Sequence, residues 1–308
     1  MAFTAADVKT LREMTGVGMM DCKKALTESN GDMDAAVVYL REKGLAAAAK
    51  KADRIAAEGL VFANVYENGV GVVVEVNSET DFVAKNDDFK KFVADVASVV
   101  AEHNPADLDA LMGLTYPASE FKVEDIQREK VLVIGENIRI RRFVRYDGGV
   151  NVSYIHGGGK VGVLVGMETD IAADKVQELG KDIAMQICAM SPRFLNRSEV
   201  NQDTLAQERE ILLVQARNEN AASDKPKPDT IIEKMVDGRM NKFYQENCLL
   251  DQAFVKENKI SVQQHVDAVA KENGGKIAVT RIVRIEKGEG IEKRQDDLAS
   301  EVAKMVGN

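Results

Sequence analysis

The chain has 308 residues, a length that predicts about two domains at roughly 150 residues per domain. Asp and Glu outnumber Lys and Arg by 50 to 41, and the net charge of −9 argues against a protein that coats nucleic acid, because phosphate binding needs an excess of basic side chains. The sequence has no apolar run of membrane-spanning length, and its first residues lack the basic head and apolar stretch of a signal peptide, so we expect a cytoplasmic protein.

Side chains that commonly carry bond chemistry are scarce in this sequence. The three cysteines, Cys22, Cys188 and Cys248, have neither the spacing of a zinc site nor the even number of a disulfide framework, which is typical of a reducing compartment. There are only three histidines, and no serine stands in a Gly-x-Ser-x-Gly motif. The composition therefore disfavours a hydrolytic enzyme, and we expect no catalytic residue, no metal ligand and no cofactor.

The N-terminal region has the apolar spacing of three short helices. The first helix is expected to stop at residues 15–18, where two glycines allow backbone angles that other residues resist, and the second begins near Met20. Residues 30–32 form a turn that caps the third helix, and Gly44 is expected to end it. The basic, alanine-rich stretch 46–57 then predicts a helical or flexible connector and a first domain boundary.

From residue 60 the pattern becomes that of β-strands, and it occurs twice along the chain. Residues 60–76 contain two β-rich runs around an Asn-Gly turn, and a helical segment follows at 87–102. Residues 148–165 repeat the hairpin and 176–190 repeat the helix, with a Glu-Thr-Asp-apolar step between them in both halves. The similar strands that close the two halves are residues 138–145 and 277–284. The sequence therefore predicts an α+β fold with two related subdomains, each a small antiparallel sheet backed by a helix.

A long polar pair of helices is expected inside the second half. Helical spacing runs through residues 205–220, a segment with two prolines at 223–229 breaks it, and the spacing resumes over 232–243. This pattern predicts an antiparallel helical hairpin that projects from the body. The hairpin could serve docking or self-association, or it could be an ordinary structural projection, and the sequence leaves both open.

Two glycine-rich segments resemble nucleotide-binding loops but fail the tests for them. Residues 157–160 lack the Walker spacing, and Val161 stands where a Ser or Thr is required. Residues 16–18 have no preceding strand and no third glycine. We interpret both as turns. His156, beside three glycines at the tip of a hairpin, is either a neutral surface residue or a ring that reaches a partner.

The most unusual local feature is the segment Thr80-Asp81-Phe82-Val83, at the corner between a strand and a helix. An aromatic ring beside an acid in such a corner is either a staple that packs the turn onto the core or an exposed anchor for another protein. Most aromatic residues at loop edges are structural, so the local pattern by itself favours the staple.

Two long stretches resemble the elongation factor Ts family of guanine-nucleotide exchange factors for elongation factor Tu. They are residues 12–26, which read REMTGVGMMDCKKAL, and residues 75–86, which read EVNSETDFVAKN. Shorter matching stretches are residues 134–138 (IGENI), His156 with 161–165 (VGVLV), 233–240 (EKMVDGRM) and 288–293 (GEGIEK). The resemblance covers essentially the whole chain.

The resemblance implies a fold that agrees with the organisation above. It adds that the three-helix module is similar to a ubiquitin-associated domain, that the hairpin is a dimerisation module, and that a helix closes the chain. The expected boundaries are 1–54 for the N-terminal module and linker, 55–147 for the first core subdomain, 148–197 and 230–285 for the second, 198–229 for the helical-hairpin insertion, whose return helix runs on past 229, and 286–308 for the C-terminal module.

The resemblance also implies how the chain acts. In the family, the segment that matches Thr80, Asp81, Phe82 and Val83 presses on the nucleotide domain of elongation factor Tu and disturbs the site of Mg²⁺ and the diphosphate. Phe82 would be the apolar wedge, and Asp81 would hydrogen bond at the start of a helix. Further contacts are implied for Met19, Met20, Lys23, Ile134, Gly135 and His156. The expected partner is elongation factor Tu, GDP-bound or nucleotide-free, with no nucleic acid, no membrane and no bond chemistry, and with homodimerisation through the hairpin as an option.

Two functions of other classes compete with exchange. One is a scaffold whose N-terminal module and hairpin tether proteins without releasing nucleotide. The other is a metal-dependent enzyme that uses scattered carboxylates. Binding that leaves GDP release unaltered would favour the first, and metal-dependent turnover without a partner would favour the second.

Overall fold

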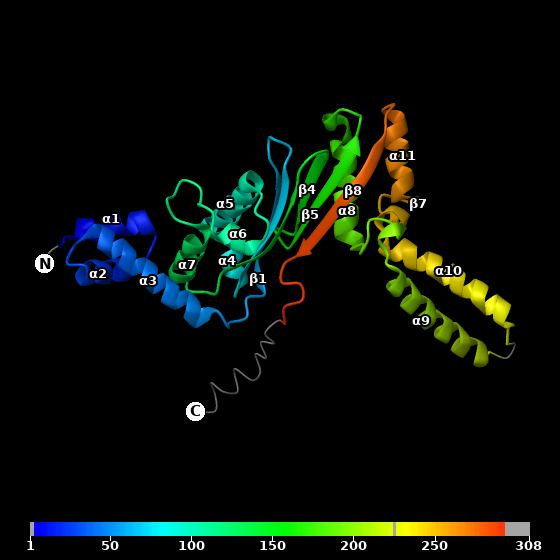
Figure 1. Cartoon of the computed structure of the whole chain (residues 1–308), viewed down its shortest axis with the longest axis horizontal. Coiled ribbons are helices and arrows are strands. Elements are labelled where there is room, and N and C mark those ends of the chain that lie inside the picture. The colour runs from blue at the N-terminus through cyan, green and yellow to red at the C-terminus, as the bar shows by residue number, and fades with distance from the viewer. Residues whose placement is uncertain (1–2, 224–225, 293–308) are drawn as a thin grey trace.

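The protein combines helices with small antiparallel sheets, which confirms the predicted α+β class. The computed structural model describes residues 3–223 and 226–292. A helical module lies at one end, two sheets lie in the middle, and a pair of long helices lies at the other end (Figure 1). The C-terminal module with its closing helix is predicted for 286–308, and residues 293–308 of that range lie outside the described residues.

The N-terminal module consists of the three predicted helices. Thr4 and Asp7 form a capping box at the start of the first helix, Gly16 with φ 68° ends it, and Asp32 caps the third. The buried side chains of Leu11 and Leu26 lie in the apolar core between the helices. The helices are α1 (Ala5–Thr15), α2 (Met19–Glu28) and α3 (Met33–Lys51).

The prediction that Gly44 ends the third helix is wrong. Helix α3 continues through Gly44 to Lys51. The connector predicted at 46–57 as helical or flexible is therefore helical as far as Lys51. A Cβ atom on Gly44 would lie 3.4 Å from the carbonyl oxygen of Arg128 on α7 (Val123–Ile134). The glycine therefore serves the close packing of two helices, and the linker begins after α3.

The two sheets have the same strand order, which confirms the duplication predicted from the sequence. Each sheet places its second strand in the middle and pairs it antiparallel with both neighbours. Each closing strand contains a β-bulge at the same position. Arg141 in the first sheet and Thr280 in the second have no partner residue on the middle strand. The strands are β1 (Glu58–Val65), β2 (Gly71–Ser78) and β3 (Arg139–Tyr146) in the first sheet, and β4 (Val150–His156), β5 (Val161–Thr169) and β8 (Ile277–Glu286) in the second.

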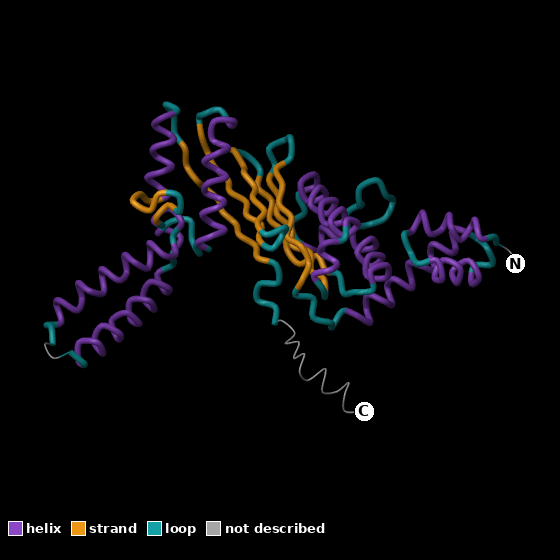
Figure 2. Tube along the Cα trace, turned by 180° about the vertical axis from the view of Figure 1, so that it is seen from behind, coloured by secondary structure: helices purple, strands orange, loops and turns teal. Residues whose placement is uncertain are grey.

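The sheets pack face to face between two layers of helices, as Figure 2 shows. Val61 and Val73 from the first sheet meet Leu164 and Ile285 from the second in this inner layer. The middle strands β2 and β5 are consequently buried on both faces, which explains their nearly continuous apolar sequences. The outer helices are α5 (Asp87–His103), α6 (Leu108–Met112) and α7 on the first sheet, and α8 (Ala173–Met190) and α11 (Val262–Glu272) on the second.

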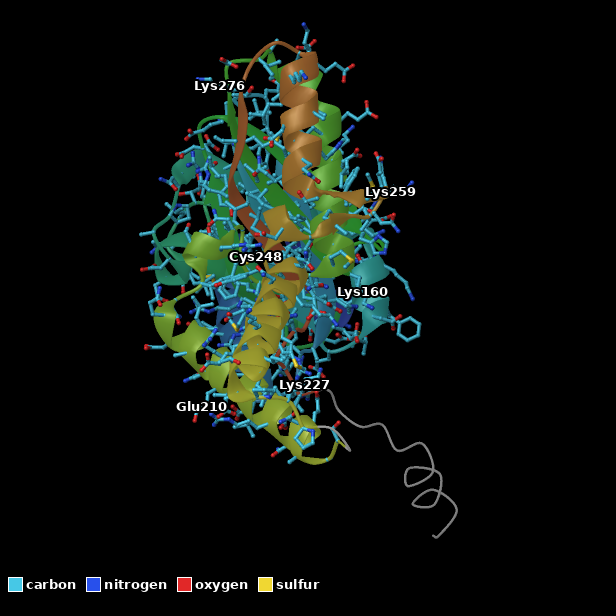
Figure 3. All side chains as sticks on the ribbon, turned by 90° about the vertical axis from the view of Figure 1, so that its right-hand side faces the viewer. Lys160, Glu210, Lys227, Cys248, Lys259 and Lys276 are labelled. Carbon is cyan, nitrogen blue, oxygen red and sulfur yellow. The ribbon has the colours of Figure 1, made fainter. Side chains whose placement is uncertain are left out.

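The predicted helical hairpin is present as α9 (Gln202–Ala221) and α10 (Asp229–Asn247). Ala216 of α9 and Val236 of α10 are buried where the two helices pack together. Figure 3 shows Cys248 where α10 meets the body, and Glu210 and Lys227 further out along the pair. A single-turn helix, η1 (Arg197–Glu199), precedes the hairpin. A second one, η2 (Leu249–Asp251), and a short sheet of β6 (Ala253–Phe254) and β7 (Glu257–Ser261) connect the hairpin to α11. Among the described helices, none has the length and apolar character needed to cross a membrane.

Candidate functional site

The segment Thr80–Val83 lies at the turn from β2 to α5 and contains the start of a short helix, α4 (Asp81–Lys85). The side chain of Val83 is only 7% exposed and joins the apolar core of the first subdomain. The ring of Phe82, in contrast, is 77% exposed. Val83 is therefore the residue that staples the turn onto the core, and Phe82 is presented to the solvent, where a partner can reach it.

Charged groups surround the exposed ring. The ammonium of Lys85 lies 2.8 Å from the carboxylate of Asp81 and 5.5 Å from the centre of the Phe82 ring. The hydrogen bond from Lys85 holds the pKa of Asp81 below its ordinary value. Asp81, the first residue of α4, thus keeps its charge at neutral pH and accepts a hydrogen bond from Lys85, the last residue of the same helix.

A shallow hollow of about 360 Å³ opens beside Phe82. It brings Ile134, the last residue of α7, next to the predicted wedge, although the two are far apart in the sequence. Gly135, the next residue, ends α7 with φ 84°, a backbone angle that favours glycine, and is exposed. The residues that line the hollow are Phe82, Val83, Asn86, Asp88, Lys130, Val133 and Ile134. The two predicted contact segments of the first subdomain therefore form one surface.

Glu136, directly after Gly135, holds the Thr80 segment in place, and the sequence by itself assigned it no role. Its carboxylate accepts hydrogen bonds from the backbone N–H groups of Glu79 and Thr80, both at 3.0 Å, and from the hydroxyl of Thr80 at 2.6 Å. Glu136 is part of the matching stretch 134–138, and it directly follows the glycine that ends α7. This position was the one local sign of a role for Glu136, because its hydrogen-bond partners lie more than fifty residues away in the chain.

The predicted contacts of the N-terminal module lie on a separate surface. Met19, Met20 and Lys23 are in the first turns of α2. The side chains of Met19 and Met20 are 51% and 76% exposed, and Lys23 is exposed as well. These residues are neighbours of one another but lie at one end of the molecule, apart from α4 (Figure 1).

His156 lies on a third surface, at the end of β4 in the second sheet. The ring is exposed, and its Nδ1 atom lies 3.1 Å from the hydroxyl of Tyr154. It borders a hollow of about 520 Å³ that Arg284 and Cys188 also line. The structure therefore does not bring His156 to Phe82, and a partner that touches both must span two subdomains.

The described residues do not favour nucleophilic or metal chemistry. Within residues 3–223 and 226–292, no three His, Cys, Asp or Glu side chains are grouped so that they could hold a metal ion. All three cysteines are free. Burial raises the pKa of Cys22 and Cys188, and raises that of Cys248 to about 11, so these thiols stay protonated at neutral pH.

The comparison with known proteins identifies the family. The model of the family described as "Elongation factor TS" matches residues 79–289, which include α4, Ile134, Gly135 and His156. The chain belongs to the elongation factor Ts family. Proteins named Elongation factor Ts are 50% identical in Magnetococcus marinus over 308 residues and 51% identical in Clostridioides difficile over 305 residues, with 99% and 98% of both chains covered.

A third elongation factor Ts, from Trichlorobacter lovleyi, is 50% identical over 315 residues and covers 100% of this chain. The similarity thus also includes the N-terminal module with Met19, Met20 and Lys23, which precedes the matched family region. Membership of the elongation factor Ts family makes this chain a translation elongation factor.

Proposed function

We propose that this chain is a guanine-nucleotide exchange factor. It would bind elongation factor Tu in the GDP-bound state and promote the release of GDP, so that GTP can bind to the emptied site. The observation that carries the proposal is the exposed ring of Phe82 on a short helix that Val83 anchors in the core. An aromatic side chain held out in this way is suited to enter a pocket of another protein.

Exchange of this kind rests on linkage between two binding events. A protein that binds the empty partner more tightly than the GDP-bound partner must weaken GDP binding by the same factor. Burial of the Phe82 ring in a partner pocket would supply part of this preference, and truncation of such an anchor costs about 2 kcal/mol or more. The chain would therefore catalyse release without making or breaking a covalent bond.

The partner's Mg²⁺ is the natural target of the wedge. The ion neutralises the phosphates of the bound nucleotide, so displacement of its ligands loosens the nucleotide electrostatically. In our proposal Thr80, Asp81, Phe82 and Val83 press on this site, while the neighbouring Ile134 and Gly135 complete the contact. Asp81, which stays ionised beside Lys85, sets the approach of the segment.

The other exposed surfaces would hold the partner during exchange. Met19, Met20 and Lys23 would grip the nucleotide domain, and His156 would contact a different domain of the partner. The outer face of the helical hairpin carries exposed Ile211 and Val214, which suits the homodimer option. The net charge of −9 suits a factor that acts in the cytoplasm by touching protein and not RNA.

The proposal is tested by following the release of a fluorescent GDP from elongation factor Tu. We expect the full chain, at saturating concentration and with excess unlabelled GDP, to accelerate release strongly. An unchanged release rate would contradict exchange. If the chain bound the partner without changing the rate, it would be a scaffold, and if it turned over a substrate with a metal and without the partner, it would be an enzyme.

A further inference from the structure

We infer that Glu136 is a positioning residue that fixes the orientation of the Phe82 wedge. The inference rests on the proposed exchange function, since it assigns a task to a side chain behind the segment that would touch the partner. It deepens that function by explaining how an exposed ring on a very short helix keeps one direction.

The need for a positioning group follows from the size of α4. The helix has five residues, and isolated helices much longer than this are already marginal in water. The backbone N–H groups in its first turn receive no side-chain cap from Thr80. Val83 is the one buried residue of α4, so packing against the core anchors the helix at a single side chain. Packing alone would leave the helix free to rotate about that anchor.

Glu136 supplies the missing constraint from outside the helix. One carboxylate oxygen accepts both backbone N–H groups that precede α4, those of Glu79 and Thr80. The other oxygen accepts the Thr80 hydroxyl, which explains why this hydroxyl does not cap α4. Three charge-assisted hydrogen bonds hold two consecutive residues, and bonds of this type are roughly twice as strong as neutral ones.

The loop that carries Glu136 is itself held firmly. Gly135 turns the chain at the end of α7, and the next backbone N–H, that of Asn137, donates to the carboxylate of Glu79 at 2.7 Å. The two segments therefore exchange hydrogen bonds in both directions. The side-chain amide of Asn137 also donates to the carbonyl of Arg54, at 2.8 Å, in the linker from the N-terminal module. Glu136 thus ties the wedge to a loop that is already fixed to two other parts of the chain.

The test compares single and double variants in the GDP-release assay at saturating chain. We expect Glu136→Ala to lower the maximal release rate about tenfold, because three charge-assisted hydrogen bonds are lost together. Glu136→Gln should keep most of the rate, since its amide oxygen can accept both backbone N–H groups and its NH₂ can donate to Thr80. The exposed Glu120, in the loop before α7, provides the matched control, and Glu120→Ala should behave as the wild type.

A double variant separates positioning from general damage. If Glu136 acts through Phe82, Glu136→Ala should cost almost nothing further in a Phe82→Ala background. Hydrogen exchange of the Glu79 and Thr80 amides in the free chain should become faster in Glu136→Ala, a readout that needs no partner. A wild-type release rate for Glu136→Ala, or effects that multiply in the double variant, would overturn the inference. If the wild-type chain did not accelerate GDP release from elongation factor Tu, the proposed function would fail instead.

Discussion

The two halves of the core contain the same four-residue step, yet they use it in opposite ways. Glu79–Phe82 follows β2, and Glu168–Ile171 begins with the last two residues of β5 and runs beyond it. In the first half, Phe82 is exposed, and the threonine is held by Glu136. In the second half, Ile171 packs against the apolar core.

The difference comes from what lies next to each turn. In the second half, the loop between α11 and β8 covers the turn. The hydroxyl of Thr169 donates to the backbone carbonyl of Lys276, and the backbone N–H of Lys276 donates to the carboxylate of Asp170. Gly275 allows this approach, since a Cβ atom there would lie 2.4 Å from the side chain of Ile171. A turn that the chain covers with its own loop is part of the structure, while the same turn left uncovered is available to a partner.

The largest effect is expected where the middle strands differ. Glu75 in β2 is fully buried, lies opposite Arg142 of β3 and forms an ion pair with it. In the second sheet, Arg281 of β8 takes the place of Arg142, and the residue opposite it in β5 is Gly166. Glu75 also accepts the N–H of Gly288 at 2.7 Å, so Glu75→Ala should leave buried donors unpaired and cost about 3 kcal/mol of unfolding free energy. Chemical denaturation measures this loss, and a change of less than about 1 kcal/mol would mean that the two sheets are equally robust at this position.

The same residue predicts a difference in acid stability. Burial opposes ionisation of Glu75, but hydrogen bonds from Gly288, Asn77 and Arg142 outweigh it, so the pKa of Glu75 lies below its ordinary value. A lowered pKa in the folded state adds stability above the ordinary pKa of about 4.3 and loses it as the pH falls through the lower folded value. Denaturation between pH 7 and 3 should therefore show a smaller acid loss for Glu75→Gln than for the wild type, and parallel curves would contradict this.

The next effect tests the comparison of the two turns directly. Phe82→Ala should lower the GDP-release rate roughly thirtyfold, the equivalent of about 2 kcal/mol, and should leave the unfolding free energy almost unchanged because the ring is exposed. Ile171→Ala should do the reverse, with a normal release rate and a stability loss of about 2 kcal/mol. The two variants serve as each other's control. Equal release rates for both would show that the turns do not differ in function.

A smaller effect is expected for Asp170→Ala. This change removes the acceptor of the Lys276 N–H, which lies 2.6 Å from the carboxylate, and should cost about 1 kcal/mol of stability. The release rate should remain that of the wild type, since the second turn faces its own chain. Thermal unfolding and the release assay measure the two quantities, and a slower release would place this turn in the partner surface.

The smallest effect concerns the charge beside the wedge. Lys85→Gln removes the cation near the Phe82 ring and the partner of Asp81. Both contacts are at an exposed site, so we expect GDP release to become only about twofold slower, with no measurable change in stability. The control is Lys90→Gln, because Lys90 forms a similar exposed ion pair with Asp87. A tenfold slower release by Lys85→Gln would mean that the ammonium itself contacts the partner.

The sequence predicts the repeated elements well because their signals are local. The two β-hairpins, the long helices and even the cap at Asp32 follow from spacing and turn residues within a few positions. Gly44 misleads because glycine commonly ends helices, whereas its reason here is the backbone of Arg128, far along the chain. The exposure of Phe82 and the part played by Glu136 are likewise set by distant segments, which no local pattern reports.

Helices α7 and α11 are not predicted, although their signals exist. Val262, Val266 and Ala270 recur at every fourth position along α11, and Ile126 and Val131 are buried along α7. The charged run between Ile126 and Val131 interrupts the apolar spacing of α7. Without α7, the sequence cannot show that Ile134 and Phe82 share a surface, so only the individual contacts could be expected.

The unbroken course of α3 has a consequence for how tightly a partner could be held. The helix has 19 residues, about 28 Å at 1.5 Å per residue, and it is joined to the core by the ion pair of Arg41 with Asp125 at 2.8 Å. The separation between Met20 and Phe82 is therefore set before any partner arrives. Once one of these contacts forms, the other meets its target at a high effective concentration, so two modest contacts can act together as one strong attachment.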